Sequence, residues 1–136
     1  MRSRRSKEMF ETGRRIRTEV LGEERVKKVL DGADAFNRDF QQLLTEYCWG
    51  TCWGRSGLTR KQRSLLNLGM LAGLNRAAEF ELHFRSAFNT GLTLDELQDT
   101  CIQIAVYCGI PAGVEAFRIA NKVIKEMKES GKLATA

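Results

Sequence analysis

Residues 77–88, AAEFELHFRSAF, have the clearest helical spacing in this chain. Five of them recur at intervals of three and four: Phe80, His83, Phe84, Ala87 and Phe88. This periodicity is typical of a helix with one apolar face turned toward a core. His83 is the only histidine in the chain, and Glu79 precedes it by one helical turn, where a carboxylate can orient an imidazole as a proton donor. The stretch therefore predicts either a structural histidine or the centre of a site.

The rest of the chain also indicates helix, because it holds a single proline, Pro111, and no sustained strand-like alternation. We expect further helices over residues 6–21, 23–30, 35–49, 60–74, 94–107 and 112–129, with a loop over residues 49–57. Capping boxes at Thr59–Gln62 and Thr93–Glu96 begin two of these helices.

Two apolar surfaces stand out in this helical pattern. The helix ending at Leu74 is apolar almost all round, which predicts a central buried helix or one covered by another subunit. The helix over 35–49, capped by Asp34, carries one apolar stripe, formed by Phe36, Phe40, Leu43, Leu44 and Tyr47. We predict an all-α, single-domain helical bundle over residues 1–136, with a basic tail at 1–7 and a C-terminal tail at 131–136.

Composition narrows the class of protein. The chain has 136 residues with a net charge of +5, and its basic excess is concentrated in the first seventeen residues. We interpret this excess as a solvated tail and expect no nucleic-acid partner, because no nucleic-acid motif accompanies it. No apolar run approaches the roughly 18 residues of a membrane span, and no apolar segment follows the basic start. We therefore expect a cytoplasmic protein with no membrane partner.

The four cysteines are Cys48, Cys52, Cys101 and Cys108. The first two have C-x-x-x-C spacing, which differs from the C-x-x-C spacing of thioredoxin-type and zinc sites. With only one histidine in the chain, a metal site is not expected. We predict that all four are small buried side chains, with a redox role for Cys48 and Cys52 as the alternative.

Arginines and tryptophans are the remaining candidates for a site. Arg60 and Arg63 lie in the first turn of a helix, where backbone N–H groups also favour anions. Capping or pairing at the surface is the alternative for both. Trp49 and Trp53, four residues apart, form either the wall of a pocket or ordinary core. Arg85 is expected to pair with Glu81, one turn away.

Five blocks of the sequence together resemble the carboxymuconolactone decarboxylase family over residues 10–128. They are RTEVLG at 17–22, YCWGTCWGRSGL at 47–58, RKQRSLL at 60–66, HFRSAFNTG at 83–91 and YCGIPA at 107–112. The first resembles a block of the dedicated 4-carboxymuconolactone decarboxylases, and the second resembles the family signature WGxxWxRPGL.

This resemblance implies an all-helical fold of the alkyl hydroperoxidase D-like type, assembled as a homohexamer. It implies decarboxylation of γ-carboxymuconolactone, a small dicarboxylate lactone, to β-ketoadipate enol-lactone and CO2 in protocatechuate breakdown. No cofactor and no metal are expected. The helix at 60–74, apolar on most sides, would be covered in such an assembly.

The residues and the chemistry together suggest a mechanism. Arg60, Arg63 and Arg17 suit the carboxylates, because guanidinium groups bind carboxylates through paired hydrogen bonds. His83, oriented by Glu79, suits the proton donor or general acid. An apolar wall of substrate-binding residues would be formed by Trp49 and Trp53, and the resemblance adds Tyr107 to the substrate-binding residues.

The chain departs from the family pattern at several positions. Ser56 replaces the signature proline, and Asn75 stands where glycine is usual. Cysteines at 48, 52 and 108 replace small apolar residues. The peroxidase-like branch of the superfamily carries C-x-x-C ahead of the histidine, where this chain has Arg76 and Glu79.

Three alternatives therefore stay open. One is a thiol-dependent peroxide or disulfide reductase that uses Cys48 and Cys52, with peroxiredoxin activity. Another is a paralogue that acts on a different small carboxylic acid. The third is a helical oligomer without enzymatic activity.

Overall fold

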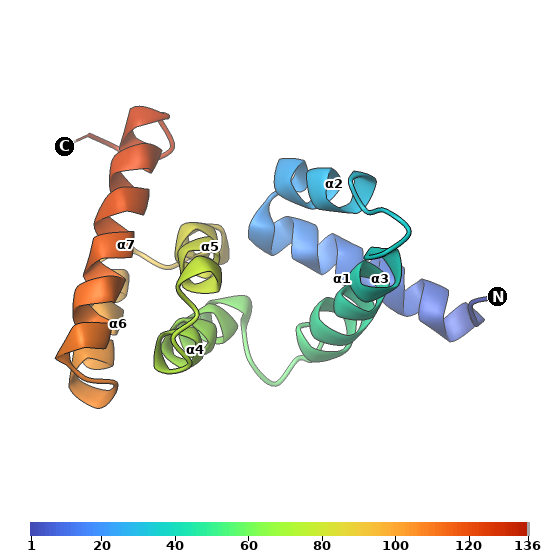
Figure 1. Ribbon diagram of the computed structural model, residues 1–136, viewed down its shortest axis with the longest axis horizontal. Coiled ribbons are helices and arrows are strands. Elements are labelled where there is room, and N and C mark those ends of the chain that lie inside the picture. The colour runs from blue at the N-terminus through green and yellow to red at the C-terminus, as the bar shows by residue number, and fades with distance from the viewer. Residues whose placement is uncertain (136) are drawn as a thin grey trace. The chain divides into compact units, whose positions relative to one another are not determined.

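Helices form every regular element between residues 1 and 135, the part of the chain that the structure describes (Figure 1). The structure is a computed structural model in which the chain forms two compact units, residues 1–63 and residues from Ser64 onward. The all-α fold class predicted from the sequence is confirmed. None of the helices in the described residues is long and apolar enough to cross a membrane.

The first unit contains α1 (Arg4–Leu21), α2 (Glu23–Asp31), α3 (Arg38–Leu44) and the π-helix η1 (Thr45–Cys52). The start of α1 differs from expectation, because the helix begins at Arg4 and not at residue 6 and so takes in part of the expected basic tail. Ser3 caps this helix by accepting a hydrogen bond from the Ser6 N–H group at 3.1 Å. Gly22 ends α1 with φ 93°, a conformation that glycine adopts without a side-chain clash.

Glycines bring α1 and η1 into backbone contact. A Cβ atom on Gly13 would overlap the Thr45 carbonyl oxygen, and one on Gly50 would lie 2.7 Å from the Met9 carbonyl oxygen. This close approach lets the core of the first unit form from α1 and the end of η1. Its buried members are Ile16, Val20, Trp49 and Trp53.

The predicted helix over 35–49 is wrong in detail. The Asp34 carboxylate caps a turn by accepting from the Phe36 and Asn37 N–H groups, so that α3 begins only at Arg38. After Leu44 the chain widens into η1, which occupies part of the expected loop. A hydrogen bond from the Trp53 N–H group to the Cys48 carbonyl, five residues back, closes this wider turn.

The apolar stripe predicted for this segment is largely exposed. Phe36 is 97% exposed, Phe40 60% and Tyr47 70%. The amphipathic pattern is present in the sequence, but nothing within the described residues buries most of its apolar face. The stripe therefore does not form the core of the first unit.

The second unit contains most of α4 (Arg60–Gly73), then α5 (Ala77–Ala87), the short 3₁₀-helix η2 (Phe88–Thr90), α6 (Leu94–Tyr107) and α7 (Ile110–Glu129). Both predicted capping boxes are confirmed, at Thr59–Gln62 and Thr93–Glu96. Helix α7 begins two residues earlier than expected, with Pro111 in its first turn, where a missing N–H group has no consequence.

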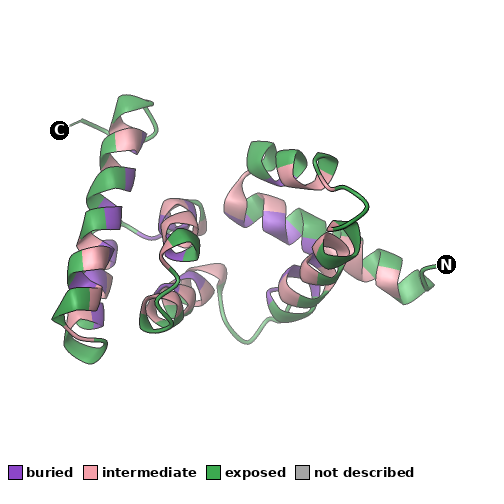
Figure 2. Ribbon diagram, in the orientation of Figure 1, coloured by how far each residue is buried: buried purple, intermediate pink, exposed green. Residues whose placement is uncertain are grey.

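The core of the second unit lies among α5, α6 and α7. Figure 2 shows that the buried residues of α7 follow one side of the helix. They are Gly113, Ala116, Ile119, Ala120, Val123 and Met127. Phe80, Phe84 and Ala87 of α5 are buried in the same cluster, as the spacing of residues 77–88 predicts.

Helix α4 is not the central buried helix of this chain. Only Ser64 and Leu68 are buried on it, whereas Leu66, Met70 and Leu74 are 49–69% exposed. The other prediction for this helix, that a further subunit covers it, stays open. The single domain expected over 1–136 also stays a prediction, and residue 136 of the expected C-terminal tail lies outside the described residues.

Candidate functional site

Arg17 is a buried cation whose hydrogen-bond partners are neutral. It lies on α1 and is 6% exposed. Its Nη1 donates to Gln41 Oε1 at 3.1 Å and to Thr45 Oγ1 at 3.3 Å. Within residues 1–135 its Nε has no acceptor, and no carboxylate pairs with it. Burial lowers the pKa of Arg17 from its usual value, but a guanidinium stays protonated in proteins.

Burial of a charge without a counterion destabilises a protein by roughly several kcal/mol unless another group compensates the charge. Among residues 1–135, Arg17 is therefore an exception as the only charged side chain that is buried. Such exceptions are more common at binding sites than in purely structural positions.

Arg60 is placed differently. Its Nε and Nη2 donate to Glu19 Oε2 at 3.2 and 3.0 Å, and its Nη1 donates to the Trp53 carbonyl at 3.2 Å. Glu19 therefore compensates its charge inside the chain. The surface-pairing alternative holds for this arginine in the structure.

Arg63 has no carboxylate partner among the described residues. Its Nη2 donates to the Arg55 carbonyl at 3.1 Å, and its Nη1 lies 3.9 Å from the Cys52 sulfur. Its Nε is buried and unpartnered within residues 1–135. Arg63 thus keeps an uncompensated positive charge at the start of α4.

Trp49 and Trp53 pack against each other within the core of the first unit. Their ring centroids are 4.9 Å apart at an interplanar angle of 32°. They are 4% and 3% exposed, which agrees with the core alternative. The carbonyl of Trp53 nevertheless holds Arg60, so this core directly supports one of the arginines.

The remaining predicted site residues lie in the second unit. His83 is half-buried on α5, and Phe80 and Phe84 of the same helix are buried. Glu79 is exposed one turn before it on the same helix. Tyr107, the last residue of α6, is 83% exposed. The predicted pairing of Glu79 with His83 stays a prediction.

Sequence reasoning missed the residues that hold the arginines. Gln41 and Thr45 bind Arg17, and Glu19 binds Arg60. Gln41 and Thr45 are one helical turn apart, and this spacing could have indicated that their side chains share a partner. Glu19 lies in the block at 17–22 that resembles the dedicated decarboxylases, yet its partner is 41 residues away.

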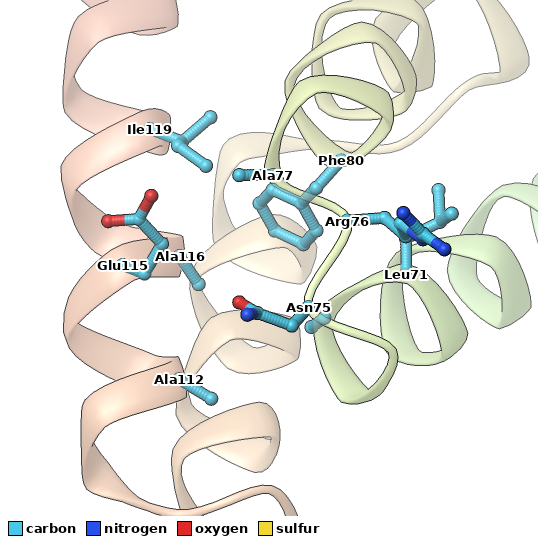
Figure 3. Close-up of a pocket in the computed structure, with 10 residues that line it drawn as sticks. Leu71, Asn75, Arg76, Ala77, Phe80, Ala112, Glu115, Ala116 and Ile119 are labelled. Carbon is cyan, nitrogen blue, oxygen red and sulfur yellow. The ribbon is translucent and has the colours of Figure 1, made fainter.

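Two cavities in the second unit contain none of the predicted site residues. Figure 3 shows the first, where Asn75 and Phe80 point toward α7. Its volume of about 30 Å³ suits a water molecule rather than a lactone. The second, of about 330 Å³, is lined by residues of α5, α6 and α7, including Cys101, Phe117 and Lys128.

The cysteines are only partly buried, which corrects the prediction for two of them. All four are free thiols; Cys101 is buried, Cys48 is half-buried, and Cys52 and Cys108 are exposed. Burial raises the pKa of the Cys48 thiol, and the neighbouring Cys52 raises it further. A raised pKa disfavours the nucleophilic thiolate, which weighs against the reductase alternative.

One predicted ion pair is also wrong. Arg85 pairs with Glu126 of α7 at 2.5 Å, and Glu81 instead pairs with Lys122 at 2.7 Å. Packing of α5 against α7 offers each residue a partner on the neighbouring helix, which replaces the pairing within α5.

The fold is all-helical, and two of its arginines are candidates for binding an anion. Neither the buried Arg17 nor the half-buried Arg63 has a carboxylate partner among residues 1–135. Residues 38–122 match the model of the carboxymuconolactone decarboxylase family, and the chain belongs to this family.

Two curated relatives cover most of the chain. A nitrosuccinic acid decarboxylase of Metarhizium robertsii is 44% identical over 123 residues, which is 90% of this chain and 86% of the relative. A 4-carboxymuconolactone decarboxylase of Acinetobacter baylyi is 39% identical over 118 residues, which is 87% of this chain and 88% of the relative. Both relatives are decarboxylases, which supports carboxy-lyase chemistry for this chain.

Proposed function

We propose that this protein removes CO2, without a cofactor, from a small dicarboxylic acid, and that γ-carboxymuconolactone is its substrate. The products are β-ketoadipate enol-lactone and CO2, which places the reaction in protocatechuate catabolism. The observation that carries the proposal is Arg17, a buried guanidinium whose only partners within residues 1–135 are neutral. A substrate carboxylate would supply the missing counterion.

We assign carboxylate binding first to Arg17 and Arg63. Neither has a carboxylate partner in the described part of the chain, and a guanidinium can hold a carboxylate through two parallel hydrogen bonds. Arg60 is also assigned to substrate binding, but it must share its charge with Glu19. Its contribution to binding should therefore be the smallest of the three.

The chemical step needs an acceptor for the electron pair that CO2 leaves behind. When the carbon–carbon bond breaks, this pair delocalises through the conjugated lactone to give a dienolate-like species, and a proton then adds to carbon. We assign His83 as the hydrogen-bond donor to the lactone carbonyl or the proton source, oriented by Glu79. Tyr107 is assigned to substrate binding.

Trp49 and Trp53 complete the assignment as an apolar backing. Both rings are buried, and the Trp53 carbonyl holds Arg60. An apolar surface beside a carboxylate disfavours its localised charge more than the spread charge of the transition state. The pair would thereby favour loss of CO2.

Nitrosuccinic acid is the second candidate substrate, because the relative that decarboxylates it is 44% identical to this chain. It is also a dicarboxylic acid with an electron acceptor beside one carboxyl group. Loss of CO2 from that carbon leaves a nitronate, so both acids require anion binding and an electron sink. The proposal of a dicarboxylate site covers either acid.

The proposal includes a homohexamer in the cytoplasm, as the sequence led us to expect. Large apolar side chains exposed on both units support assembly, among them Phe36, Tyr47, Leu74 and Val106. Soluble monomers rarely expose contiguous apolar patches of large area.

The test measures CO2 release from freshly generated γ-carboxymuconolactone and, in parallel, from nitrosuccinate, with and without a chelator. We expect chelator-insensitive release from γ-carboxymuconolactone together with loss of the lactone absorbance. Release from nitrosuccinate alone would correct the substrate. A folded protein that releases CO2 from neither acid would refute the proposal.

A further inference from the structure

The guanidinium of Arg17 has one occupied edge and one unoccupied edge. Nη1 donates to Gln41 Oε1 and Thr45 Oγ1. Within residues 1–135 both side-chain hydrogen bonds of Arg17 come from Nη1 and none comes from Nη2, and Nε is buried without an acceptor. The edge formed by Nε and Nη2 is therefore the part of Arg17 that can receive a ligand.

This edge matches a carboxylate, as another arginine of the chain demonstrates. Arg118 donates from Nε and Nη2 to the two carboxylate oxygens of Glu115, at 2.8 and 2.7 Å. Paired bonds of this kind are strong and fix the orientation of the carboxylate. Because Arg17 is only 6% exposed, a carboxylate held on this edge would be largely shielded from solvent.

Thr45 and Gln41 determine which edge stays unoccupied. Thr45 is completely buried, and its hydroxyl donates to the Gln41 carbonyl at 2.7 Å. Since its proton is committed to that carbonyl, the hydroxyl oxygen can only accept from Arg17. These bonds tie Nη1 to the junction where α3 passes into η1.

We propose that Thr45 and Gln41 are positioning residues, which hold Nη1 of Arg17 so that its Nε–Nη2 edge binds one carboxylate of the substrate. This inference rests on the proposed decarboxylase function. Neither residue needs to touch the substrate, because both act through Arg17.

Thr45→Val tests the proposal, because it keeps the branched shape and removes the hydroxyl. Succinate serves as the dicarboxylate probe, and isothermal titration calorimetry on the full chain measures its Kd. We expect the Kd to rise about tenfold, as for loss of a hydrogen bond to a charged group. In turnover, KM should rise by a similar factor while kcat changes less, and Thr45→Ser should restore both Kd and KM.

Thr51→Val is the matched control. Thr51 lies on the same π-helix, and its exposed hydroxyl donates to the Glu46 carbonyl at 3.2 Å. Its removal also deletes a hydroxyl-to-carbonyl bond of η1, but it leaves Arg17 untouched. We expect the succinate Kd of this variant to equal that of the wild type.

Gln41→Glu provides a second test that does not depend on how well Thr45→Val folds. This variant places a carboxylate of the protein itself beside Nη1, where it compensates the positive charge of Arg17 without a ligand. We expect the succinate Kd to rise at least about tenfold while the thermal midpoint holds or rises. If Gln41 has a purely structural role, the Gln41→Glu variant should have the same or higher stability and should bind succinate as the wild type does.

Several outcomes would overturn the inference. Folded Thr45→Val and Gln41→Glu variants that bind succinate like the wild type would do so, and so would a wild type that fails to bind succinate. If succinate binding depends on Thr45 but the protein decarboxylates neither acid, the proposed reaction is refuted and the positioning role is supported.

Discussion

Arg60 and Arg63 lie three residues apart at the start of α4, yet among residues 1–135 only the first of them has a carboxylate partner. Because of this difference, we expect the two arginines to contribute unequally to substrate binding. Arg63→Ala should lower kcat/KM by about tenfold to a hundredfold, mainly by raising KM, because it removes a charge held equally against substrate and transition state. Steady-state kinetics on γ-carboxymuconolactone measures the effect.

Arg60→Ala is the matched control for this experiment. Because Glu19 already compensates Arg60, its removal should change kcat/KM several-fold less than removal of Arg63. An unchanged kcat/KM in Arg63→Ala would show that Arg63 only ties the loop at Arg55 to the start of α4.

In the proposed mechanism, His83 is the general acid or hydrogen-bond donor. His83→Ala should reduce kcat by about a hundredfold or more, as expected for loss of a general acid. His83→Gln keeps a hydrogen-bond donor and should retain more activity than His83→Ala. Single-turnover CO2 release measures both variants, and near-normal turnover in His83→Ala would remove His83 from the mechanism.

The buried thiol of Cys101 should make the free energy of unfolding depend on pH. Burial raises its pKa from 9.0 to about 11, so the native state keeps the proton at pH values where the unfolded state loses it. Its contribution to stability is complete below pH 9 and falls as pH rises toward 11, by at most about 3 kcal/mol. Urea unfolding across this range should show a shallower loss in Cys101→Ala than in the wild type. Identical pH slopes would contradict the assignment.

At the residue scale, local sequence predicted the types of site residue but not their partners. Arg17, Arg60 and Arg63 were identifiable from the family blocks. Whether each charge is compensated depends on long-range contacts, as between Arg60 and Glu19. The exposure of Cys52 could not be predicted either, since it follows from the π-helix.

Among the elements, the crossing of α1 and η1 depends on glycine. Gly13→Ala should destabilise the protein by about 2–3 kcal/mol, because its Cβ would overlap the Thr45 carbonyl oxygen. Gly69→Ala, within α4, is the control: its Cβ would meet nothing within 4 Å, and the higher helix propensity of alanine should stabilise by about 1 kcal/mol. Chemical denaturation measures both, and equal effects would contradict the close contact.

Helix boundaries were predictable wherever a side chain or glycine marks them. Thr59 and Thr93 begin α4 and α6 through hydrogen bonds that need only four consecutive residues. The π-helix was not predictable, because its i, i+5 bonds carry no comparable local signature. Its contact with α1, through Gly13 and Gly50, involves residues more than thirty positions apart.

For the whole molecule, the all-α class followed from periodicity and the near absence of proline. The burial of particular helices did not follow. Phe36, Phe40 and Tyr47 have core-like spacing but are exposed in the structure. Apolar periodicity specifies that a face must be covered, but it does not specify whether the same chain or another copy covers it.

The proposed homohexamer makes this distinction testable. Phe40→Glu should place a charge on the exposed apolar stripe of α3 and weaken assembly, because burial of an unpaired charge at an interface is unfavourable. Light scattering coupled to gel filtration should give a hexamer for the wild type and smaller species for the variant. Lys27→Glu on α2, an exposed position away from the stripe, is the control. A monomeric wild type would contradict the proposed assembly.

Comparison of the wild type with Arg17→Gln tests most directly whether the chain decarboxylates a dicarboxylic acid that Arg17 holds. The measurement is the initial rate of CO2 release from γ-carboxymuconolactone and from nitrosuccinate, with circular dichroism to confirm that both proteins are folded. We expect turnover by the wild type, and a kcat/KM at least about a hundredfold lower in the folded variant. Equal rates in the two proteins, or no CO2 from either acid with the wild type, would contradict this expectation.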